Sequence, residues 1–90
     1  MPRKAKVGDL VEVTWADAVF YTDLADVDDE TLKNGGEICF TTGYVIAYDS
    51  KVIVLAAELS DEREPMRDIN IIPIGMVKRV KVLTKGRFGV

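Results

Sequence analysis

Five short segments rich in β-branched and aromatic residues, separated by turn-forming residues, dominate this sequence. In residues 10–15 apolar and polar side chains alternate, which is typical of a strand with one buried face. Four further strands are expected at residues 37–48, 51–59, 68–73 and 77–83. Because no segment has the apolar spacing of a long amphipathic helix, the pattern predicts an all-β domain. A strongly bent, five-stranded small barrel, closed or nearly closed, is the expected architecture.

The chain has 90 residues, which is enough for one domain. We expect a single domain over 1–90, with its core at 7–84, a helical or loop insertion at 17–36 and a flexible tail at 85–90. At this size apolar burial at about 25 cal/mol per Å² barely offsets about 1.5 kcal/mol per ordered residue, so the core needs support. Cys39 is the single cysteine and there is no histidine, which excludes an intrachain disulfide and argues against a zinc site. Self-association remains as the expected support.

The third expected strand is apolar on both faces. Val52 and Val54 lie on one face, and Ile53 and Leu55 lie on the other. A small barrel has one interior, so the outer apolar face needs another cover. We expect a second copy to provide it, with edge strands pairing between copies.

The segment 17–36 is acidic and differs from the rest. Asp28 is expected to cap a short helix with Asp29 and Glu30 in its first turn. Asn34 and Gly35 are the residues expected to end it. A calcium loop is the alternative, but the segment lacks the glycine and the distal glutamate that such loops require. We therefore expect a solvated loop with one or two helical turns.

The net charge of −3 conceals an uneven distribution, because all fifteen acids fall between Asp9 and Asp68 and eight of the twelve bases lie near the ends. If the termini meet in space, one face is basic; the alternative is a charged, solvated surface. The basic N-terminal residues precede no apolar run, and no stretch is long enough to span a membrane. We expect a protein of the bacterial or phage-infected host cytosol with no membrane partner.

Two motifs resemble those of the Sm-like proteins, which include Lsm and Hfq. Residues 43–52, GYVIAYDSKV, resemble the bent second strand, aromatic-aspartate turn and third strand of the first motif. Residues 72–80, IPIGMVKRV, resemble the second motif, a short strand and a glycine turn before the last strand. From its own residues, the turn at 74–76 is expected to form one turn of 3₁₀ helix. The pattern is also similar to small uncharacterised proteins of tailed bacteriophages, and plain SH3-like barrels share much of it.

The resemblance implies a homo-oligomeric ring of roughly five to seven copies, joined by the fourth strand of one subunit and the fifth strand of the next. The expected interface residues come from these two strands: Ile69, Ile71, Ile72, Val77, Val80 and Val82.

The resemblance also implies a uridine site around the hairpin and the glycine turn. Asp49 matches the family's aspartate, whereas Ile53 and Ile74 stand where an asparagine and an arginine are expected. Isoleucine can neither hydrogen-bond a base edge nor stack on it as a cation. The candidate nucleic-acid-binding residues are Tyr48, Asp49, Lys51, Gly75 and Lys78.

Three functions follow as expectations. The first is a non-catalytic ring that binds RNA weakly through its pore region. The second is a phage-type accessory or scaffold ring that acts on a host protein without the uridine pocket, and the third is small-ligand capture between subunits. An enzyme is not expected, because histidine is absent and Ser50 and Ser60 lie in expected loops with no base beside them. No cofactor or metal is expected.

Overall fold

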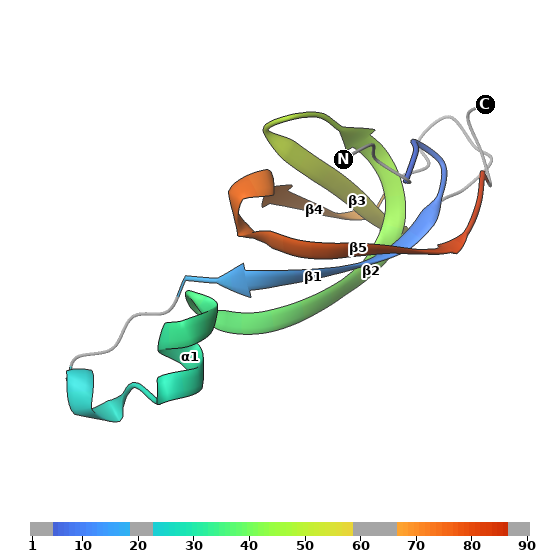
Figure 1. Cartoon of the computed structure of the whole chain (residues 1–90). Coiled ribbons are helices and arrows are strands. Elements are labelled where there is room, and N and C mark those ends of the chain that lie inside the picture. Colours follow the sequence, from blue (N-terminus) through green and yellow to red (C-terminus); the bar gives the residue numbers. More distant parts are fainter. Residues whose placement is uncertain (1–4, 19–22, 59–66, 87–90) are drawn as a thin grey trace.

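The computed structural model describes residues 5–18, 23–58 and 67–86 (Figure 1). One antiparallel sheet contains the five strands: β1 (Leu10–Asp17), β2 (Glu37–Tyr48), β3 (Val52–Glu58), β4 (Arg67–Pro73) and β5 (Val77–Thr84). Their order is β4-β3-β2-β1-β5, so β4 and β5 are the two edges. The all-β, five-stranded architecture is confirmed. The sheet is bent but not closed, because β4 and β5 do not pair with each other within the described part of the chain.

The long strand β2 bends and belongs to both halves of the sheet (Figure 1). Its first part opposes β1, with Tyr44 opposite Leu10, and its last part opposes β3, with Tyr44 opposite Ala56. Gly43 lies at this transition, where an added Cβ would stand 3.0 Å from the Ala56 carbonyl oxygen and from the Leu55 Cβ. The glycine therefore permits a close approach between β2 and β3 at the bend.

The core lies on the concave side of the bent sheet. The side chains of Val11, Val13, Val45, Ile53 and Leu55 are fully buried there. They come from three adjacent strands and occupy alternate positions in β1 and β3, as the period of a half-buried strand requires. The expectation that Ile53 and Leu55 share one face is confirmed, since Val52 and Val54 are only half-buried.

The acidic insertion contains a 3₁₀ turn, η1 (Leu24–Asp26), and one short helix, α1 (Asp29–Asn34). The expected caps are confirmed. The Asp28 carboxylate accepts a 2.7 Å hydrogen bond from the Thr31 N–H, and Gly35 ends the helix in the left-handed conformation with φ of 80°. We call residues 23–37 the acidic arm, because Figure 1 shows them projecting beyond the bent sheet, between the end of β1 and the start of β2.

The parts outside the described residues include two expected features. These are Leu59, the last residue of the expected third strand, and residues 87–90, which make up most of the expected tail. Within the described part of the chain, no helix is long and apolar enough to cross a membrane.

Candidate functional site

The turn between β2 and β3 is closed by Asp49. Its Oδ1 accepts hydrogen bonds from the N–H groups of Lys51, at 2.7 Å, and Val52, at 2.9 Å. The Asp49 N–H also donates to the Val52 carbonyl oxygen at 3.0 Å. This side chain thus holds the hairpin turn in shape, as aspartate commonly does at such positions.

The glycine turn of the second motif lies against this hairpin. It forms the expected 3₁₀ turn, η2 (Ile74–Met76), whose Ile74 N–H donates a 2.8 Å hydrogen bond to the Lys51 carbonyl oxygen. The structure therefore brings Gly75 next to Lys51, and both residues are exposed. Tyr48 is half-buried and packs against the core. Lys78 is exposed on β5, two residues beyond η2.

Two isoleucines replace polar residues of the implied uridine site, and the structure gives both a packing role. Ile53 is fully buried in the core, and Ile74 is half-buried and packs against the same cluster. The positions where the resemblance implies polar base contacts therefore contribute apolar side chains to the core of the bent sheet.

The two edge strands present different surfaces. On β4 the side chains of Ile69 and Ile71 are 44% and 66% exposed, and Ile71 lies opposite Val54 on the outer face. Ile72, the third β4 residue of the expected interface, is only 2% exposed, and its side chain belongs to the core of this chain.

On β5 apolar and basic residues alternate. Val80 and Val82 are half-buried and pack against the core, as does Val77 at the start of the strand. Arg79 and Lys81 are exposed and lie opposite Thr14 and Glu12 of β1 on the outer face. The outer face of this edge is therefore cationic, whereas that of β4 is aliphatic.

A buried carboxylate at Asp9 was not anticipated from the sequence, where residues 7–9 indicate only a turn. The residue is 3% exposed, and its side chain accepts hydrogen bonds from the N–H groups of Lys6, at 2.9 Å, and Gly86, at 2.6 Å. The Gly86 bond foremost, then the Lys6 bond, holds the Asp9 pKa below its ordinary value despite burial. Nothing near Asp9 in the sequence could have identified Gly86 as its partner.

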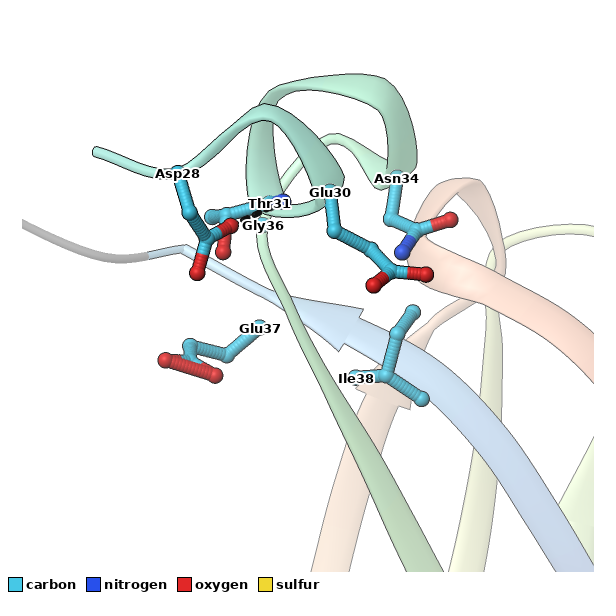
Figure 2. Close-up of a pocket in the computed structure, with 7 residues that line it drawn as sticks. All are labelled: Asp28, Glu30, Thr31, Asn34, Gly36, Glu37 and Ile38. Atoms are coloured by element: carbon cyan, nitrogen blue, oxygen red, sulfur yellow. Dashed lines mark hydrogen bonds between the residues drawn. The ribbon is translucent and has the colours of Figure 1, made fainter.

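A small acidic hollow lies between α1 and the start of β2 (Figure 2). Figure 2 shows the carboxylates of Asp28, Glu30 and Glu37 around it, with Asn34 and Ile38 on its far side. The hydrogen bond from the Thr31 backbone N–H holds the Asp28 pKa below its ordinary value. In the described ranges, no three histidine, cysteine, aspartate or glutamate side chains are grouped so that they could hold a metal ion.

The sheet edges and the paired turns are thus the features from which a function can be argued. No protein-family model matches the chain, and no curated protein or solved structure shows significant similarity to it.

Proposed function

We propose that this protein is a non-catalytic assembly module in which β4 of one copy pairs with β5 of the next to form a ring. The observation that carries the proposal is the open sheet, in which each of these strands has one edge without a partner strand among the described residues. Unpaired N–H and C=O groups at such edges favour the addition of another strand. The exposed Ile69 and Ile71 beside the β4 edge add apolar surface that pairing would cover.

The difference between the edges favours pairing of β4 with β5. Pairing β5 with β5 would bring Arg79 and Lys81 of both copies together, and like charges on neighbouring strands are destabilising. Pairing β4 with β5 instead lets the aliphatic stems of Arg79 and Lys81 cover Ile71. Because this contact joins two different surfaces, it repeats from copy to copy and closes into a ring when the rotation permits.

The test is the mass of the protein in solution, compared for two matched variants. Ile71 and Phe40 are both 66% exposed, but Ile71 lies on β4, which forms the proposed contact, whereas Phe40 lies in the first half of β2, which pairs with β1 and takes no part in that contact. Light scattering should give five to seven times the chain mass of 10.0 kDa for the wild type. Ile71→Ser should lower this mass and Phe40→Ser should leave it unchanged. A wild type of 10.0 kDa at all concentrations contradicts the ring.

Weak RNA binding at the paired turns is the second candidate function. Its support is the 2.8 Å bond from the Ile74 N–H to the Lys51 carbonyl oxygen, which places an exposed lysine beside the exposed Gly75 turn. In a ring these turns would be repeated around the axis, so that several lysines act on one strand of RNA.

Titration of labelled oligouridine at low salt tests this function. We expect weak, salt-sensitive binding that Lys51→Glu abolishes. Absence of binding at tens of micromolar protein would leave the ring as a scaffold for protein contacts alone, the role that agrees with apolar Ile53 and Ile74.

A further inference from the structure

Acidic and basic residues of this protein gather at opposite ends of its long axis. Residues 17–37 contain seven acids and one base, Lys33, whereas residues 77–86 contain four bases and no acid. The molecule measures 49 × 30 × 21 Å, and Figure 1 shows α1 at one end and the end of β5 at the other. The protein is therefore elongated, with an acidic end and a basic end.

The basic end is assembled by Asp9. Its two hydrogen bonds hold the backbone of Lys6 and Gly86 on the same carboxylate, so that Lys6 and Lys85 come close to each other. Lys81 lies on the outer face of β5 a few residues earlier. We define the basic end by five exposed residues: Lys6, Val7, Lys81, Leu83 and Lys85.

Exposed apolar side chains occur at both ends. In α1, Leu32 is 58% exposed and stands in the same short helix as the exposed acids Asp29 and Glu30. At the basic end, Val7 is 43% exposed and Leu83 is 46% exposed. Each end thus combines apolar side chains with an excess of charge of one sign, and the two signs are opposite. Lys33 is the one base of the arm, and Asp9 is the buried acid at the basic end.

We propose that α1 of one copy docks on the basic end of a second copy, with Leu32 against Val7 and Leu83, and with Asp29 and Glu30 against the lysines. The charges and the apolar side chains are complementary, and both are supplied by the chain itself. Among the described residues, the acids of α1 form no ion pair within their own chain. The ion pair in this part of the chain joins Arg67 and Glu58 instead.

A second copy fits the basic end better than a nucleic acid does. The whole chain carries a net charge of −3, and the acidic arm would repel a polyanion that approaches the molecule. For another copy the same arm is the source of the attraction. The contact uses side chains at the ends of the long axis and does not involve β4. It shares Lys81 of β5 with the proposed ring contact, so it is tested in a background from which the ring contact has been removed.

The proposal is tested by reversing the charges of each end. The arm variant is Asp29→Lys with Glu30→Lys, and the strand variant is Lys81→Glu with Lys85→Glu. Both are made in the Ile71→Ser background, which removes the proposed ring contact, and self-association is measured by sedimentation at low and high salt. If the ring proposal is wrong, Ile71→Ser should self-associate as the wild type does. The charge-reversal variants are then compared with it in the same way, so the two proposals can fail independently.

Each variant alone should associate about tenfold more weakly than its background at low salt, because its two ends then carry the same sign. An equal mixture of the two variants should recover the association, since each arm then meets an oppositely charged end on the other variant. Lys33→Gln, which removes the single base of the arm, should strengthen association about twofold. High salt should remove all of these differences.

Three results would overturn the proposal: a background without salt-sensitive association, charge reversal without effect, or a mixture that does not recover. Trp15 fluorescence reports whether each variant is folded. If the arm variant does not fold, Leu32→Ser keeps every charge and should still weaken association. An oligonucleotide that binds the background but not the strand variant, with self-association unchanged, would assign the basic end to nucleic acid instead.

Discussion

The backbone N–H of Gly86 donates a 2.6 Å hydrogen bond to the carboxylate of Asp9, a residue 77 positions earlier in the chain. The other oxygen of the same carboxylate accepts from the Lys6 N–H. A buried aspartate thus joins the turn before β1 to the segment after β5. Because both donors are backbone groups and the acceptor is charged, these are among the stronger hydrogen bonds of the molecule.

Replacing this aspartate should destabilise the fold. In Asp9→Asn the charge is lost. The amide NH₂ group must also face the N–H of either Lys6 or Gly86, and two donors cannot form a hydrogen bond with each other. We expect the free energy of unfolding to fall by about 1–3 kcal/mol, as measured by urea denaturation. Asp26→Asn changes the same group at an exposed position and should have almost no effect. Equal effects of the two substitutions would show that the Asp9 bonds contribute little.

The Asp9 bonds also predict how stability depends on pH. The Gly86 and Lys6 bonds hold the pKa of Asp9 lower in the folded protein than in the unfolded chain. This stabilisation is therefore complete above the ordinary pKa of about 3.9, and it is lost as the pH falls through the lower pKa of the folded state. The stability difference between wild type and Asp9→Asn should shrink over this acid range. A difference that stays constant down to the acid limit would contradict the assignment.

The hydrogen bond from Trp15 Nε1 to Thr41 Oγ1, at 2.9 Å, joins β1 to β2 beside the core. Thr41→Val keeps the shape of the side chain but removes the acceptor, which leaves the partly buried indole N–H without this partner. We expect a loss of about 1–3 kcal/mol in unfolding free energy. Trp15 is the single tryptophan, so its fluorescence reports the change directly. An unchanged emission spectrum and unchanged stability would mean that water replaces the hydroxyl without cost. Thr42→Val, at an exposed position of the same strand, is the matched control.

The two glycines after α1 should differ in their tolerance of alanine. At Gly36, with φ of 141°, an added Cβ would overlap the carbonyl oxygen of Asp17, whereas at Gly35 no atom lies within 4 Å of it. Gly35→Ala should cost about 1 kcal/mol for its left-handed backbone alone, and Gly36→Ala should cost clearly more. Amide hydrogen exchange of α1 and the first residues of β2 would locate the damage. Equal costs would show that the arm shifts freely at its base.

Features set by neighbouring residues could be predicted from the sequence. The cap at Asp28, the end of α1 at Gly35 and the 3₁₀ turn at Gly75 depend on side chains and backbone conformations within a few positions. The strand 37–48 was predicted with its observed bounds, because its β-branched and aromatic residues form one run between two turn signals. The first strand extends to Asp17, two residues beyond the alternating pattern, because pairing with β2 continues there.

Features set by distant pairs could not be predicted in this way. Whether β4 pairs with β5 depends on how strongly the whole sheet bends, and the sequence pattern does not determine the degree of bending. Ile72 was expected at the interface because the Sm-like resemblance implies that the fourth strand joins the subunits, and only its register opposite Ile53 shows that its side chain faces the core. The hydrogen bond between Asp9 and Gly86 could not be predicted for the same reason, because it joins residues 77 positions apart in the sequence.

The sheet order has a consequence for the kinetics of folding. The strands β2, β3 and β4 follow one another and can pair as soon as each has been synthesised, but β1 obtains its second neighbour from β5, the last strand made. Closing so large a loop is entropically slow, and proteins dominated by such distant pairings fold in about milliseconds to seconds. The meander should therefore form early, while one side of β1 stays uncovered until β5 has been synthesised.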